Sequence, residues 1–198
     1  MSDPQNTSST LLARVRDAQD FEAWDQFLDI YTPMVRGFCS KRGLQAADAE
    51  DVSQEVMKSV AQSIRKFEYD RARGTFRSWL FTVTRSKLNN FFSARRRHPQ
   101  GSGSTDMHRF LEEQPSLEEE REWDRDYKRR LFEWAAEDIR DEFQDTTWQA
   151  FWRTSVENSP TVTVAESLGM TAGAVYIAKS RVTARLRERI LEVAEENF

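Results

Sequence analysis

The chain has 198 residues, of which 38% are hydrophobic, 12% aromatic and 31% charged, and its formal net charge is −4. This length allows one domain or two small ones, and the apolar content suffices for a folded core. Seven glycines and five prolines are few for the many turns of a β-sandwich or barrel, so the predicted fold class is all-α. No apolar run is long enough for a membrane span, and the polar N-terminus lacks the pattern of a signal peptide.

The residue types that usually carry catalysis are scarce. Cys39 is the single cysteine, which excludes a disulfide framework and is typical of a cytoplasmic protein. His98 and His108 are the two histidines, so we expect no enzymatic activity, no cofactor and no metal. Charge is segregated instead: basic stretches at 85–97 and 179–189 flank an acidic one at 112–126. This order indicates two nucleic-acid contacts held apart by a spacer.

The first half of the chain is predicted to form helices after a disordered tail at residues 1–9. A short helix carries Leu11 and Val15, and a second runs from about residue 20 to Gly43, with apolar residues three and four apart. Pro33 is expected to kink that helix. A third helix is predicted to start at Asp48, and a fourth covers about 76–96. Together these form an expected domain over 10–97.

The second half begins with glycines, prolines and serines, which predict a flexible linker that we place at 98–125. A long helix over roughly 117–143 and another from Trp148 to about Asn158 follow. The expected second domain, 126–198, ends with the pattern of a helix-turn-helix: Gly169 can form the tight turn and Thr171 can cap the next helix. An ordinary helical hairpin with a solvated basic face is the alternative interpretation.

Two segments of the first domain could carry function. In DAEDVSQEVMKSV (48–60) the polar residues share one side of the predicted helix, which by itself is also the pattern of a solvated face. In FRSWLFTVTRSKLNNFFSARRR (76–97) aromatic residues alternate with Arg, Lys and Asn, a composition that can stack on unpaired bases and hold phosphates. Its apolar members Trp79, Leu80 and Val83 are assigned to the core.

The order of these motifs, DAED-x-x-QE, then F-R-S-W-L-F-x-x-x-R, then an arginine run and a helix-turn-helix, resembles bacterial RNA polymerase sigma factors of the extracytoplasmic-function (ECF) type, in the sigma-70 family. The resemblance covers about residues 10–97 and 126–192. It implies a transcription initiation factor that binds core RNA polymerase through the β′ clamp helices and the β flap, and that binds promoter DNA. It leaves open an anti-sigma factor or a regulatory kinase as a further partner, and it implies neither membrane insertion nor an obligate homo-oligomer.

The resemblance also implies roles for particular residues. The residues expected to bind core polymerase are Asp48, Asp51, Gln54, Glu55 and Lys58. Those expected to capture the melted −10 strand are Arg71, Arg73, Ser86, Asn89, Asn90, Arg95 and Arg96. Those expected to read the −35 duplex are Tyr176, Ile177, Lys179, Ser180, Arg181 and Arg185. Members of the family commonly carry an arginine where this chain has Ala178, and often an asparagine where it has Ser86.

Two other classes of protein were weighed. A helix-turn-helix regulator that binds only duplex DNA fits residues 163–189 equally well, but it leaves the helix at 76–97 and the acidic face at 48–58 unexplained. A hydrolase or metalloenzyme would need the carboxylates of Asp48, Glu50, Asp51 and Glu55 as a metal site. No histidine lies near them in the sequence, and their spacing is ordinary for the start of a helix.

Overall fold

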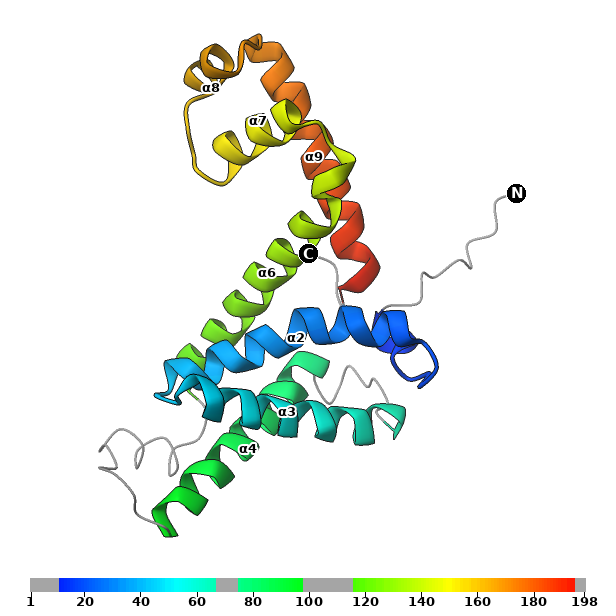
Figure 1. The fold of residues 1–198 in the computed structure, drawn as a ribbon, viewed down its shortest axis with the longest axis vertical. Helices are drawn as coiled ribbons and strands as arrows, with labels where there is room; N and C mark the ends of the chain where they lie inside the picture. Colours follow the sequence, from blue (N-terminus) through cyan, green and yellow to red (C-terminus); the bar gives the residue numbers. More distant parts are fainter. Residues whose placement is uncertain (1–10, 67–74, 98–115, 195–198) are drawn as a thin grey trace. The chain divides into compact units, whose positions relative to one another are not determined.

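A computed structural model of the chain describes residues 11–66, 75–97 and 116–194, and it confirms the all-α fold class: these residues form helices and no strands (Figure 1). The helices are α1 (Leu11–Arg14), α2 (Phe21–Lys41), α3 (Ala46–Ser63), the 3-10 helix η1 (Ile64–Lys66), α4 (Phe76–Arg97), α6 (Leu117–Ile139), the 3-10 helix η3 (Arg140–Glu142), α7 (Asp145–Ser155), α8 (Thr161–Leu168) and α9 (Ala172–Val193). No helix among these residues is long and apolar enough to cross a membrane. The chain divides into a first unit, Ser9–Arg130, and a second unit containing Leu131–Phe198.

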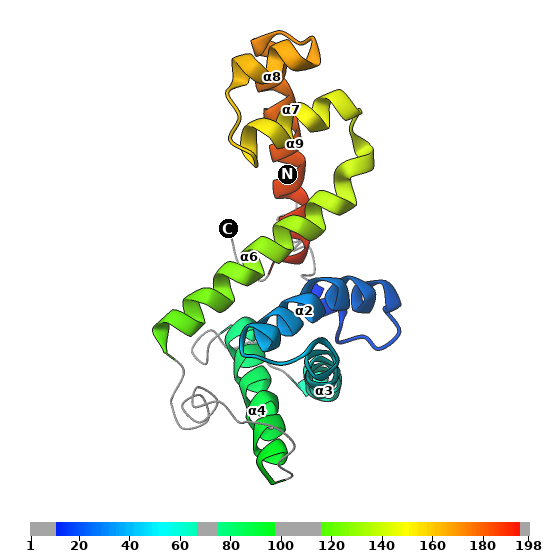
Figure 2. The same cartoon turned by 60° about the vertical axis from the view of Figure 1, so that its left-hand side comes forward.

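In the first unit, α3 packs against both α2 and α4 (Figure 2). The core is rich in aromatic rings, because every third or fourth residue of α2 faces inward. Phe27, Tyr31 and Phe76 are almost fully buried, and their ring centroids lie 4.5 to 5.8 Å apart. Burial of such side chains contributes about 1.5–3 kcal/mol each, so this cluster is the main attachment of α4 to α2.

Side-chain caps explain where α2 begins. The carboxylate of Asp20 accepts a hydrogen bond from the Ala23 N–H (2.9 Å), which satisfies one free donor of the first turn. Arg14 donates two hydrogen bonds to the same carboxylate, both 2.9 Å long, and these bonds hold the pKa of Asp20 below its usual range. The end of the helix is followed by Gly43, whose φ of +87° lies in the left-handed region favoured by glycine.

Pro33 lies inside α2, and the helix is continuous through it. A proline lacks an N–H, so the carbonyl four residues earlier, that of Asp29, has no donor within the helix. Arg130 of α6 occupies this position: its Nε and Nη2 donate to the Asp29 carbonyl oxygen at 3.1 and 3.0 Å. A side chain from a distant segment therefore replaces the missing backbone donor.

The first half of α6 belongs to the first unit. Trp123 and Tyr127 are one turn apart and 2% and 1% exposed. The ring of Trp123 contacts those of Phe38 and Phe81, with centroids 5.1 and 5.4 Å apart, and the ring of Tyr127 stacks on Tyr31. The segment at 98–125 that the sequence predicted to be a linker is therefore helical from Leu117 onward, and residues 98–115 lie outside the described residues.

The boundary between the units differs from the predicted one for the same reason. It lies between Arg130 and Leu131 within α6, and not at residue 126. The run of charged residues along 112–126 is typical of a solvated spacer, and it hides two aromatic residues that face the core of the first unit. The helix start was also misplaced for α3, which begins at Ala46 after an N-cap residue, Gln45, while Asp48 lies in its first turn.

In the second unit, α7 and α8 pack against α9 (Figure 1). Small side chains make this contact close, and its core consists of Ala150, Val164, Ala165, Val175 and Ala178. The end of α6 is joined to α9 by Arg189, which donates to Asp138 at 2.6 Å and lies 4.4 Å from the centroid of the Trp134 ring. The second unit thus presents the full length of α9 on a compact support.

Candidate nucleic-acid interface

The turn between α8 and α9 has the geometry that the sequence predicts. Gly169 has a φ of +64°, where a residue with a Cβ is strained, and its neighbour Met170 donates to the Ala165 carbonyl at 2.9 Å. The Thr171 hydroxyl oxygen accepts from the Ala174 N–H at 3.1 Å and caps α9. Together these features fix the direction in which α9 leaves α8.

The outward face of α9 carries the residues that were predicted to read duplex DNA. Val175, Ala178 and Val182 are buried against the other helices of the unit. The exposed residues between them are Tyr176 (62%), Ile177 (63%), Lys179, Ser180 and Arg181. Burial of Ala178 shows that this position faces the core, so the arginine common there in the family would need a different packing. Large exposed apolar side chains next to cations form a surface suited to base edges and phosphates.

Arg185 has different surroundings from the rest of this set. Its guanidinium forms a two-pronged ion pair with Glu142 of η3, at 2.7 and 2.8 Å. These hydrogen bonds hold the pKa of Glu142 below its usual range. The guanidinium is thus engaged within the second unit, and a contact between Arg185 and DNA stays a prediction.

The residues predicted to bind core polymerase lie along one side of α3. Asp51, Gln54, Glu55 and Lys58 are exposed and Asp48 is partly buried, whereas Val52, Val56 and Val60 face the core as predicted. Lys58 donates to Glu55 at 2.7 Å, and this bond lowers the pKa of the Glu55 carboxylate. The face is therefore an exposed, ionised strip that contributes little to the core of the fold.

The −10 set is only partly described. Ser86 and Asn90 are exposed on α4, and Asn89 is half-buried with its Oδ1 buried and without a hydrogen-bond partner among the described residues. Arg95 donates to Asp48 at 3.0 Å, so it joins the predicted −10 and core-binding sets on one surface. Arg71 and Arg73 lie outside the described residues, as does the side chain of Arg96.

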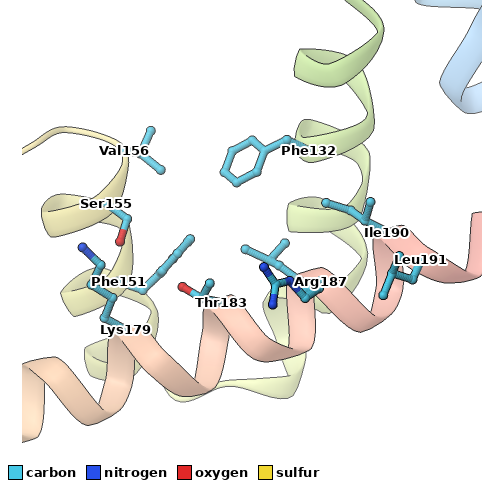
Figure 3. A pocket seen from close by; sticks show the side chains of 10 residues that line it. Phe132, Phe151, Ser155, Val156, Lys179, Thr183, Arg187, Ile190 and Leu191 are labelled. Carbon is cyan, nitrogen blue, oxygen red and sulfur yellow. The ribbon is translucent and has the colours of Figure 1, made fainter. Parts of the chain in front are cut away.

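The second unit also has an apolar groove that the sequence reasoning missed. It has a volume of about 720 Å³ and lies between α6, α7 and α9 (Figure 3). The side chains that point into it are mainly Phe132, Phe151, Val156, Ile190 and Leu191, and Lys179 and Arg187 lie at its edge. Its residues come from three separate helices, so no local pattern could have indicated it, although the exposed Leu191 was a weak signal.

Charged residues of the first unit form a second cluster that the sequence did not predict. Arg85 is only 7% exposed although it belongs to the basic stretch of α4. It donates to Glu119 of α6, which also accepts from Arg42 at 3.0 Å. Lys41 donates to Glu122 and Asp126 of α6 at 2.9 and 2.7 Å. The acidic stretch that was predicted to be a spacer thus neutralises cations of the first unit.

The four carboxylates considered for a metal site take part in separate ion pairs or stay exposed. Glu50 pairs with Arg36 at 2.8 Å, Asp48 with Arg95 and Glu55 with Lys58. Among the described residues no three side chains of the metal-ligating types converge. Their arrangement is that of a charged helix face.

Residues 27–98, which cover most of α2 and all of α3 and α4, match the sequence family Sigma-70 region 2. The first unit therefore contains a domain of the sigma-70 family. The chain is also similar to the ECF RNA polymerase sigma factor RpoE of Cereibacter sphaeroides, with 34% identity over 77 residues, or 39% of this chain and 41% of that protein. Both findings bear out the resemblance to the ECF type that the motifs indicate. The match spans about two fifths of the length of that relative.

Proposed function

We propose that this protein is an RNA polymerase sigma factor that directs transcription initiation at particular promoters. The observation that carries the proposal is the match of α2–α4 to sigma-70 region 2, on a unit whose α3 presents an exposed acidic strip. The protein has no catalytic residues in this proposal. It supplies specificity and strand separation to the polymerase.

The proposed contacts divide among three surfaces. The α3 strip binds the β′ clamp helices, and Ser86, Asn89 and Asn90 of α4 hold the melted −10 strand. The exposed face of α9 reads the −35 duplex in the major groove, where each base pair presents a distinct pattern of donors and acceptors. The groove between α6, α7 and α9 receives an apolar element of the β flap, since its lining is apolar and open to solvent.

The α3 strip offers the sharpest test. Asp51 and Glu55 are four residues apart and exposed, so Asp51→Lys with Glu55→Lys should leave the melting temperature nearly unchanged. At an interface with basic clamp residues the same change places like charges together. We expect loss of core binding in a pull-down and loss of promoter-specific run-off transcription.

A matched control is Glu22→Lys with Asp25→Lys, which makes the same charge change at exposed positions of α2 and should keep both activities. A folded Asp51→Lys, Glu55→Lys protein that still binds core and initiates would refute the assignment of this interface. A wild-type protein that binds duplex DNA tightly by itself and ignores core would instead support the regulator that binds only duplex DNA.

A further inference from the structure

The first half of α6 has a composition that an ordinary structural helix does not need. Its buried side holds two aromatic residues, Trp123 and Tyr127, and around them stand Glu119, Glu122 and Asp126, all partly shielded from solvent. Each of these acids forms an ion pair with a cation of α2 or α4. The contact therefore combines an apolar centre with a charged rim, as in the grooves by which proteins bind amphipathic helices.

The surface under α6 is complementary to that composition. The rings of Phe38 and Phe81 form its floor, and the guanidinium carbon of Arg42 lies 3.3 Å from the centroid of the Phe38 ring. Arg42 and Arg85 are largely buried at this edge, so each needs a carboxylate when it is removed from water. An acidic helix with aromatic residues one turn apart satisfies both requirements.

The same helix also belongs to the second unit. Its residues after Arg130, including Leu131, Ala135 and Ile139, are buried in the core of that unit, and the helix is continuous across the boundary. If the two units are held at a spacing set by promoter DNA and polymerase, as in the proposed function, a single helix anchored in both must release one anchor or break. The ion pairs of the first half are partly exposed and therefore weaken as salt screens them.

We propose that residues 117–130 are a removable latch, which docks on the cationic, aromatic groove formed by α2 and α4 and can leave it while both units stay folded. Release frees Lys41, Arg42 and Arg85 and lengthens the chain between the units by the latch segment. The part of the proposal that concerns spacing rests on the proposed function. The docking and release do not, and they are tested without polymerase or promoter.

Hydrogen exchange of the wild-type protein tests whether the latch opens separately. The comparison uses amides 121–130 and 131–139 of the same helix, because the first four amides of any helix lack an internal acceptor. We expect amides 121–130 to exchange at least tenfold faster than amides 131–139 and than the core of α2. Equal protection of 121–130 and the α2 core would show that the segment opens only with the whole unit, which would overturn the proposal.

A peptide added in trans tests whether the groove can be vacated and refilled. The probe is a fluorescent peptide with the sequence of residues 116–131, and the proteins are full-length wild type, Trp123→Ala, and Glu122→Lys with Asp126→Lys. We expect the peptide to bind both variants at least tenfold more tightly than the wild type, whose groove is occupied. A peptide that carries the two lysine changes should bind at least tenfold more weakly to the Trp123→Ala protein.

The control protein carries Glu118→Lys and Glu120→Lys, which make the same charge change on the exposed side of the same helix. It should bind the peptide as the wild type does. Equal binding to all four proteins, or binding to none, would overturn the latch. If Trp123→Ala lowers the stability of the first unit, the pair at Glu122 and Asp126 decides, since neither side chain is part of the apolar core. Binding of oligo(dT) to the vacated groove in place of the peptide would show a nucleic-acid site, and it would likewise refute the helix groove.

Discussion

Arg181 and Arg185 lie one turn apart on α9 and have different surroundings. Arg181 is exposed and forms no ion pair with the residues that the structure describes, whereas Arg185 is bound to Glu142. Arg181→Ala should therefore leave stability unchanged and remove a base-edge contact worth about 1–3 kcal/mol. The expected result is a weaker preference at one position of the −35 element, measured by transcription from a panel of single-base promoter variants.

Arg187→Ala is the matched control for Arg181, because it removes the same charge from an exposed position of α9 at the edge of the groove. It should change the overall transcription level without changing the ratio between promoter variants. An Arg181→Ala protein with the preferences of the wild type would contradict the assignment.

Cys39 should make stability depend on pH in the alkaline range. Burial raises the pKa of its thiol from 9.0 to about 12, although the nearby charge of Arg42 lowers it slightly. Below pH 9 the thiol is protonated in both the folded and unfolded states, so it contributes no pH dependence. Between pH 9 and 12 only the unfolded chain loses the proton, and stability should fall by about 1.4 kcal/mol per pH unit from this group.

Urea unfolding at pH 8.5 and 10.5 measures this effect, with Cys39→Ala as the reference. The alanine variant loses packing at every pH but lacks the titration, so the difference in unfolding free energy between the two proteins should shrink as pH rises. Parallel pH profiles would show that the thiol ionises as easily in the folded protein as in the unfolded chain.

At the scale of single helices, the turn before α9 allows a comparison of two glycines. Gly169 has a positive φ and Gly173 lies in the first turn of α9, and a Cβ at either position meets no atom closer than 3.9 Å. Gly169→Ala should therefore destabilise the second unit through backbone strain alone, by about 1–2 kcal/mol. Gly173→Ala should stabilise it by up to about 1 kcal/mol, since alanine favours the helix.

Thermal melts of the two variants measure the sign of each effect. Opposite shifts in melting temperature are expected from the same chemical change a few residues apart. A Gly169→Ala protein as stable as the wild type would mean that the turn can relax to a negative φ, and the direction of α9 would then be less firmly fixed than its geometry indicates.

The helices themselves were largely predictable from the sequence. Apolar residues three and four apart located α2, α4 and α9, and Thr171 and Gly169 located the turn, because these signals are local. The first half of α6 was not predictable as a docked helix, because its acids are typical of a solvated spacer and their partners Lys41, Arg42 and Arg85 are distant in sequence. The groove of the second unit was missed for the same reason.

At the scale of the whole molecule, the proposed capture of the −10 strand predicts a defect in promoter opening. Asn89→Ala with Asn90→Ala removes two amides from α4, one of which has a buried oxygen with no partner among the described residues. Transcription from duplex promoter should fall, and a template already mismatched across the −10 element should recover part of the loss, because unpairing costs a few kcal/mol that this template no longer requires.

The comparison of the two templates is the measurement, made with wild type and variant at equal core occupancy. An equal loss on both templates would place the defect in core binding or folding. The roles of Asn89 and Asn90 rest on the family resemblance, since neither the spacing of these residues nor their exposure distinguishes strand capture from an ordinary polar helix face.

The proline in α2 ties two distant positions together. While Pro33 is present, the Asp29 carbonyl depends on Arg130 for its donors, so losing Arg130 leaves that carbonyl without them. Once Pro33 is replaced by a residue with an N–H, the helix supplies the donor and Arg130 becomes dispensable there. The two changes are thus tolerated in one order and harmful in the other. A lineage that drifts away from this arginine must first give up its proline, and relatives should be found with the pair, with neither, or with the arginine alone.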